Sequence, residues 1–130
     1  MMEKYGHAVT RIWLSGVLLW FGVSQALSPG DWTGYLPDIA LAWTGMSATT
    51  LVGLNGAVEV ACGALLLIGL FTRFVAFVMG MHLVLIAASL GNSAVAIRDW
   101  GLAAACLSLV FTGPGAWAFD KPRDPRDLRI

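Results

Sequence analysis

Glu59 and His82 are two ionisable residues that lie inside long apolar stretches of the sequence. A charged group inside a membrane is costly, so it faces protein, water or a partner rather than lipid. A carboxyl and an imidazole that lie together could move a proton or hydrogen-bond a lipid-soluble ligand such as a quinone. The same groups could instead form a buried hydrogen bond that locks the helices together, with Glu59 protonated. The sequence leaves both interpretations open.

Four further polar residues are candidates for binding a ligand: Gln25, Asn55, Arg98 and Asp99. We place Gln25 and Asn55 in the outer halves of their helices, and Arg98 and Asp99 at the start of the last helix. All four would then line the outer mouth of a polar pocket. The alternative for Arg98 and Asp99 is local, because an acidic residue near a helix start favours the dipole and Arg98 can reach lipid headgroups.

The sequence contains no zinc, EF-hand, P-loop or dinucleotide-binding motif. Cys62 and Cys106 are isolated in apolar runs without a CxxC pair, so we interpret them as small core residues, and a disulfide-exchange enzyme fits poorly. His7 is the only histidine besides His82, so no metal or bis-histidine haem site is expected within one chain. The net charge of zero offers no field for nucleic acid.

The composition indicates a membrane protein. Of the 130 residues, 58% are hydrophobic and 12% are charged. Soluble domains carry about 25% charged residues, so this chain could not cover a water-facing surface. The length suits a single domain.

Four apolar runs approach the roughly 20 residues that a membrane-spanning helix needs. We predict an all-α integral membrane protein, a four-transmembrane-helix antiparallel bundle formed by residues 1–120, with a polar tail at 121–130. The predicted spans cover about residues 10–28, 50–70, 73–91 and 98–113.

The connections favour antiparallel neighbours. Between the second and third runs, Gly69 can close one helix and Thr72 can cap the next, which predicts a tight helical hairpin. A short segment also joins the third and fourth runs. The longer connection between the first two runs has apolar residues at helical spacing, which indicates an amphipathic outer segment or, alternatively, a plain ordered loop.

The hairpin places Glu59 and His82 at one depth. Glu59 lies about twelve residues before Phe71, at the centre of the turn, and His82 lies about eleven after it. At roughly 1.5 Å of rise per residue, these positions are nearly level. Gly56 and Gly63 flank Glu59 on its own helix face, and glycines let a neighbouring backbone approach. Glu59 should therefore point at another helix.

The basic residues predict the orientation. With four spans, every Lys and Arg except Arg98 falls on one side of the membrane. Such asymmetry places the N and C termini in the cytoplasm. The rival interpretation takes the first run as a cleaved signal peptide ending near "SQA", which would leave three spans.

The stretch "NGAVEVACGALLLIGLFTR" resembles the second-helix pattern of the DoxX family of small bacterial membrane proteins. The residues that match are Glu59, Gly63, Gly69, Thr72 and Arg73.

Three other stretches support the resemblance. "RIWLSGVLLWFGVSQAL" is similar to the family's first helix, and "PGDWTGYLPDI" to its outer loop. "IRDWGLAAACLSLVFTGPGAWAFDK" resembles the last helix through a set of matching residues: Arg98, Asp99, Gly113, Pro114, Gly115, Trp117 and Asp120. Two departures stand out: Gln25 replaces a lysine that is frequent in the family, and His82 is not part of the pattern.

The resemblance implies a four-helix, multi-pass protein of the bacterial inner membrane. Some members are the small membrane subunit of a thiosulfate:quinone oxidoreductase, and others are membrane partners of oxidative-stress complexes. We therefore expect a non-catalytic membrane subunit or anchor for a redox partner, without an intrinsic cofactor. The alternative is a quinone-reactive subunit in which Glu59 and His82 handle protons. A small-solute transporter is a third, weaker hypothesis. The expected partners are the lipid bilayer and a partner protein or a second copy.

Overall fold

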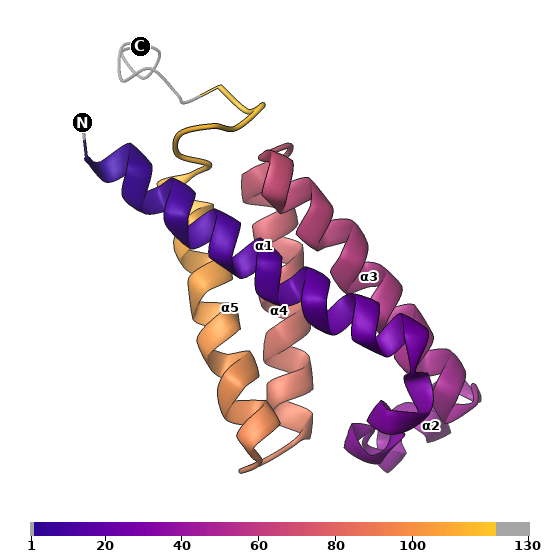
Figure 1. Ribbon diagram of the computed structural model, residues 1–130. Coiled ribbons are helices and arrows are strands. Elements are labelled where there is room, and N and C mark those ends of the chain that lie inside the picture. The colour runs from indigo at the N-terminus through magenta and orange to yellow at the C-terminus, as the bar shows by residue number, and fades with distance from the viewer. Residues whose placement is uncertain (1, 122–130) are drawn as a thin grey trace.

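The computed structural model describes residues 2–121, which form helices joined by short connections, with no strand in that range (Figure 1). The all-helical prediction is confirmed. The four long helices are α1 (Glu3–Leu27), α3 (Ala48–Ile68), α4 (Thr72–Ser89) and α5 (Ala94–Thr112). Two short helices follow α1, namely the 3₁₀ helix η1 (Pro29–Tyr35) and α2 (Asp38–Thr44). Beyond Lys121, the predicted polar tail lies outside the described residues.

The helices have the length and composition of membrane spans. α3, α4 and α5 are each long and apolar enough to cross a bilayer. α1 meets this condition together with η1, from which it is bent by 108°. The described residues therefore provide three candidate spans, or four when the bent pair counts as one.

The last helix begins one turn before its predicted start. The Ser93 side chain accepts a hydrogen bond from the backbone N–H of Ala96 (3.1 Å), so the helix is capped at Ser93 and starts at Ala94. Arg98 and Asp99 consequently lie inside α5. The interpretation of this pair as a helix-start signal is wrong, because a serine that precedes it already supplies the cap.

The connection between the first two long helices is helical in two pieces rather than a plain loop. The indole Nε1 of Trp32 in η1 donates to the Ser24 hydroxyl of α1 at 3.2 Å, which holds the segment against the end of that helix. In α2, Ile39 and Trp43 are exposed. The apolar spacing in the sequence therefore does mark short helices.

The long helices pack as two pairs (Figure 1). α1 lies mainly along α3, and α4 lies mainly along α5. The hairpin neighbours α3 and α4 meet at their shared turn and then diverge toward the end that carries η1 and α2. This divergence leaves room between the pairs at that end.

The contact between α1 and α3 depends on two glycines. A Cβ atom on Gly56 would lie 2.7 Å from the carbonyl oxygen of Gly22, and one on Gly22 would lie 2.8 Å from that of Gly56. The two backbones therefore touch, as in other close crossings of membrane helices. The close-packed seam predicted beside Glu59 does form, and its partner helix is α1.

The N-terminus of α4, at the turn after α3, is capped by a residue far away in the sequence. Gly69 closes α3 in the left-handed conformation (φ 70°), as predicted. Thr72 does not cap α4: it is the first helical residue, and its hydroxyl has no hydrogen-bond partner among the described residues. Instead the Asp120 carboxylate accepts the backbone N–H groups of Phe71 (3.0 Å) and Thr72 (2.6 Å). The C-terminal segment therefore supplies the N-cap of α4.

Arg11 is buried completely and binds backbone carbonyls from two distant segments. Its Nη1 donates to Leu66 at the end of α3 (2.7 Å), and its Nε donates to Pro114 after α5 (2.8 Å). Its Nη2 donates to Ala116 (3.0 Å) and Trp117 (2.9 Å). Arg11 thus joins α1 to α3 and to the segment after α5, a role beyond the cytoplasmic flanking charge that the sequence suggested.

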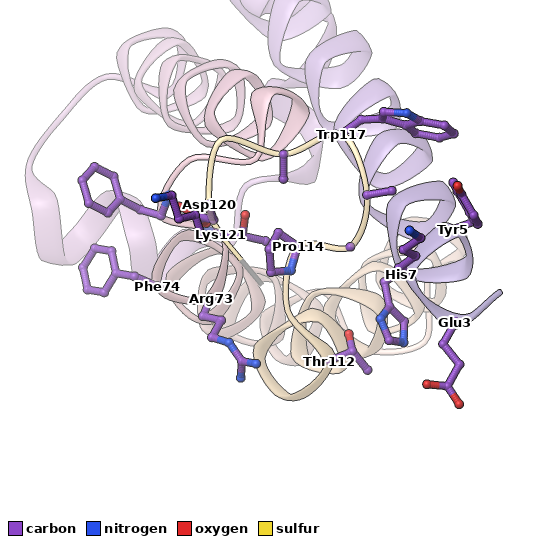
Figure 2. Close-up of a pocket in the computed structure, with 16 residues that line it drawn as sticks. Glu3, Tyr5, His7, Arg73, Phe74, Thr112, Pro114, Trp117, Asp120 and Lys121 are labelled. Atoms are coloured by element: carbon purple, nitrogen blue, oxygen red, sulfur yellow. The ribbon is translucent and has the colours of Figure 1, made fainter. Parts of the chain in front are cut away.

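Figure 2 shows this end of the molecule, where the segment carrying Pro114 and Trp117 lies between the start of α1 and the start of α4. Arg73 also binds backbone here, because its Nη1 donates to the carbonyls of Val110 (2.6 Å) and Phe111 (3.2 Å) at the end of α5. The surrounding hollow measures about 850 Å³. Most of the residues from Gly69 to Asp120 that match the DoxX pattern therefore lie at this end of the molecule, where the segment after α5 packs against α1, α3 and α4.

Replacing Arg11 with methionine should lower the free energy of unfolding by about 3 kcal/mol or more, because several buried carbonyls lose a charged donor. The midpoint of thermal denaturation in detergent measures the loss. Arg73→Met is the matched control: Arg73 is exposed and donates to two carbonyls, so a loss of about 1 kcal/mol is expected there. Equal losses in both variants would contradict the central role of Arg11.

Asp120→Asn should cost about 1 kcal/mol of stability at neutral pH, since it removes a charged helix cap. Burial alone would raise the pKa of Asp120, but the hydrogen bonds from Thr72 and Phe71 and the nearby Arg11 charge hold this pKa below 3.8. A carboxyl with a depressed folded-state pKa stabilises the protein above its ordinary pKa, and the contribution disappears as pH falls through the folded value.

The difference in thermal midpoint between wild type and Asp120→Asn should therefore be constant at neutral pH and shrink below about pH 4. Asp38→Asn, at an exposed carboxylate in the first turn of α2, is the control and should stay near wild type throughout. A wild-type advantage that persists undiminished at about pH 2 would show that the carboxylate charge is not responsible.

Candidate functional site

A pocket of about 620 Å³ lies where the two helix pairs diverge. α3, α4 and the first turns of α5 form its walls, and η1 and α2 lie across its outer side. Most of the wall is apolar, with aromatic side chains from η1. Its polar lining residues include Thr44 and Ser89 and a further six: Gln25, Asn55, Glu59, His82, Arg98 and Asp99. These are the six predicted proton-handling and ligand-binding residues, and the fold brings all of them to one cavity.

Four of these side chains form a hydrogen-bonded chain across three helices. His82 Nε2 on α4 lies 2.6 Å from Asn55 Oδ1 on α3. The Asn55 amide donates to Glu59 Oε1 (3.1 Å) and to Gln25 Oε1 on α1 (2.7 Å). The Gln25 amide in turn donates to Glu59 Oε2 (3.2 Å). The chain therefore runs from the pocket wall at His82 to the buried Glu59.

Glu59 and His82 are not directly hydrogen-bonded. The two residues share a cavity, in keeping with the depth count along the hairpin, but Asn55 stands between them. Asn55 lies on the same face of α3 as Glu59, four residues earlier, so its amide can bridge to the neighbouring helix. Glu59 and His82 are therefore connected through Asn55, which the sequence predicted only as a ligand contact.

The donors and acceptors of this chain alternate consistently. Both oxygens of Glu59 accept an amide N–H, which an ionised and a protonated carboxyl can both do. Because Asn55 Oδ1 is an acceptor, His82 donates from Nε2, as both the neutral Nε2–H tautomer and the imidazolium can.

Arg98 and Asp99 form an ion pair on the α5 side of the pocket. Arg98 donates from Nη2 (2.6 Å) and Nε (2.7 Å), both to Asp99 Oδ1. The guanidinium carbon lies 3.9 Å from the centre of the Phe21 ring on α1. Asp99 is 1% exposed, and its Oδ2 has no hydrogen-bond partner among the described residues. One carboxylate oxygen in the wall of the pocket is therefore unpaired.

Sequence reasoning missed Phe21 and the aromatic wall. Phe21 precedes Gln25 by four residues and so shares its helix face, which is the signal that could have identified it. Trp32 and Tyr35 were assigned to the amphipathic segment, although they also line the pocket. A position on a connecting segment gives no information about which cavity that segment covers.

The cysteines lie away from the polar residues of this pocket. Cys106 belongs to the apolar core, and Cys62 packs against that core. Both are free thiols. Within residues 2–121, no group of three or more His, Cys, Asp or Glu side chains could hold a metal ion.

The site is a pocket with a hydrogen-bonded chain of imidazole, amide and carboxyl groups in its wall. Such groups can orient a polar ligand headgroup, and the imidazole and carboxyl groups at the two ends of the chain can each bind a proton. The apolar wall suits a ring or an acyl chain.

The comparisons with known proteins agree with the resemblance seen in the sequence. The family model described as DoxX matches residues 6–92, which is more than half of the chain. The match includes α1, α3 and α4 with Gln25, Asn55, Glu59 and His82, and it ends before Arg98 and Asp99. No curated protein and no solved structure matches the chain. The chain belongs to the DoxX family.

Proposed function

We propose that this protein is a membrane subunit of a redox assembly and that its pocket holds a quinone-type ligand. The observation that carries the proposal is the hydrogen-bonded chain from His82 through Asn55 to Glu59, located in a pocket whose wall is otherwise mainly apolar. A quinone has this same division, with a polar headgroup on an apolar body. The ring of such a ligand would supply the electron chemistry, which the chain itself lacks the cofactor motifs to perform.

The residues of the pocket fit such a ligand. Arg98 carries one guanidinium nitrogen, Nη1, for which no hydrogen bond is formed among the described residues, and Gln25 has a second amide hydrogen. Either group can donate to a carbonyl oxygen. Trp32 and Tyr35 from η1 offer flat apolar surfaces to a ring. The His82–Asn55–Glu59 chain could then exchange a proton with a bound headgroup.

The topology of the proposal is a four-span bundle in the bacterial inner membrane with both termini in the cytoplasm. The skew of basic residues supports this orientation. It places the Arg11 closure at the cytoplasmic end and the pocket in the outer half. A ligand dissolved in the membrane would then reach the pocket from the outer leaflet, while a soluble redox partner could dock on either face.

The second candidate is a purely structural anchor, and one observation favours it. The amide and carboxylate groups around Glu59 satisfy one another, and they lie directly beside the Gly22–Gly56 contact. Such a satisfied network would lock α1 to α3 without a ligand. The two candidate functions make different predictions for a filled pocket: a quinone-binding subunit would lose its ligand, whereas a structural anchor has no ligand to lose.

Filling the pocket should abolish quinone binding. Ile86 on α4 lines the cavity, and Ile86→Trp would occupy much of its volume. Binding of a short-chain benzoquinone to the full chain in lipid nanodiscs measures the effect. We expect a loss of at least about tenfold in affinity, equivalent to about 1.4 kcal/mol.

Val78→Trp is the matched control for Ile86→Trp, because Val78 lies on the same helix, is exposed, and does not line the pocket. It should bind the quinone as wild type does. Undiminished binding in Ile86→Trp would contradict the placement of the ligand, and absence of binding in wild type would leave only the structural anchor.

Glu59→Leu should destabilise the protein, because the Gln25 and Asn55 amides lose a buried acceptor, at about 1–3 kcal/mol for each unpaired group. Glu59→Gln keeps the size of the side chain and should cost less. Thermal midpoints in detergent measure both, with Glu3→Leu at an exposed carboxylate as the control.

The two Glu59 variants also distinguish a structural role of Glu59 in joining the helices from a role in proton exchange. If Glu59→Leu is monodisperse and as stable as wild type, Glu59 does not lock the helices. If Glu59→Gln leaves both the affinity for quinone and its pH dependence unchanged, Glu59 takes no part in proton exchange with the ligand.

A further inference from the structure

The unpaired oxygen of Asp99 indicates which chemical form of ligand the pocket selects. Asp99 lies in the wall of the pocket at 1% exposure, and its Oδ2 has no hydrogen-bond partner among the described residues. Buried side-chain oxygens in proteins nearly always have a partner, and leaving one unpaired is unfavourable, most of all when it is charged. A group that fits this position must bring a hydrogen-bond donor.

Asp99 is available as an acceptor only. Its other oxygen, Oδ1, holds Arg98 through two nitrogens at 2.6 and 2.7 Å, which is the geometry of an ion pair. The guanidinium in turn rests on the Phe21 ring, so its place is fixed from α1. An ionised carboxylate has no proton to donate. Oδ2 therefore cannot hydrogen-bond to a carbonyl oxygen, which is itself only an acceptor.

His82 adds a second acceptor to the same pocket. Its Nε2 hydrogen is committed to Asn55 Oδ1 at 2.6 Å, so a neutral ring has its lone pair at Nδ1. The imidazole comes from α4 and the carboxylate from α5, and both residues line the cavity. With a neutral His82 ring, the pocket thus has acceptor groups on two of its walls.

We propose that the pocket binds a hydroxyl-bearing aromatic ligand, a quinol or phenol, in preference to the corresponding quinone, with Asp99 Oδ2 accepting the hydrogen bond of the hydroxyl. The inference rests on the proposed function and names the form of ligand that the site takes. A quinone offers carbonyl acceptors alone, which suit the donors of Arg98 and Gln25 but would face an acceptor at Asp99. A quinol offers O–H donors to that position and to His82.

The selectivity can be measured without any catalytic activity. The probes are a short-chain benzoquinol, the matching benzoquinone, and the dimethyl ether of the quinol, which has the same ring but no donor. Each is titrated anaerobically against the full chain in lipid nanodiscs. A hydrogen bond to a charged acceptor is stronger than one to a neutral acceptor, so the quinol should bind at least about tenfold more tightly than the quinone and the ether, equivalent to about 1.4 kcal/mol.

Asp99→Asn keeps the shape of the side chain and can place an amide donor where the oxygen was. In this variant the preference for quinol over quinone should fall below about twofold or reverse. Asp31→Asn, the same change at an exposed carboxylate outside the pocket, should keep the wild-type preference. If Asp99→Asn does not fold, the comparison of quinol with its ether on wild type tests the donor requirement directly.

The outcomes separate this inference from the function on which it rests. Equal or tighter binding of the quinone by wild type overturns the inference and leaves the quinone-type pocket standing. A quinol preference that Asp99→Asn retains also overturns it, because the donor is then recognised elsewhere. Failure of all three probes to bind overturns both the inference and the proposed function.

Discussion

The burial of one guanidinium determines how this chain is held together. Inside a membrane, backbone carbonyls at the ends of helices have no water to bind, so they need donors from the protein. Arg11 supplies donors to the end of α3 and to the segment after α5, while its charge is dispersed over several carbonyl dipoles. Asp120 stabilises the same end of the molecule with a negative charge, because its carboxylate accepts hydrogen bonds from the first backbone N–H groups of α4. The two residues close one end of the molecule, and the helices are free to diverge at the other.

That arrangement explains why the pocket lies at the far end. The Gly22–Gly56 contact holds α1 and α3 together along their length, and α4 and α5 form a pair of their own. Because the pairs are tied at the Arg11 end, their divergence opens a wedge beneath η1 and α2. The polar residues occupy this wedge, where Gln25, Asn55 and His82 reach partners on other helices and Arg98 pairs with Asp99 within α5. Position in the fold thus accounts for the tolerance of a carboxylate in so apolar a sequence.

Several of these features could be predicted from residue types and spacing. Helix count, the seam beside Glu59, the closure at Gly69 and the grouping of polar residues all follow from apolar periodicity, small residues and depth along a hairpin. Rotation about helix axes does not follow, so Asn55 between Glu59 and His82 was not foreseen. The roles of Arg11 and Asp120 were not predicted either. Their partners are backbone groups more than forty residues away in the sequence; Asp120 and Thr72, for example, are separated by 48 residues. Backbone partners carry no residue-type signal, and only the fold identifies them.

The closure at the Arg11 end also has a consequence for the order of assembly. The guanidinium of Arg11 and the carbonyl of Pro114 are separated by 103 residues. When the chain is inserted from its N-terminus, α1 therefore enters the membrane before Pro114 is available, and this bond forms only after α5 and the segment that follows it have been synthesised. Contacts of such long range are the slowest to form, since the intervening chain must already be ordered. Arg11 can therefore bind α3 before it binds the segment after α5, and its set of hydrogen bonds is completed only when that segment folds back onto α1.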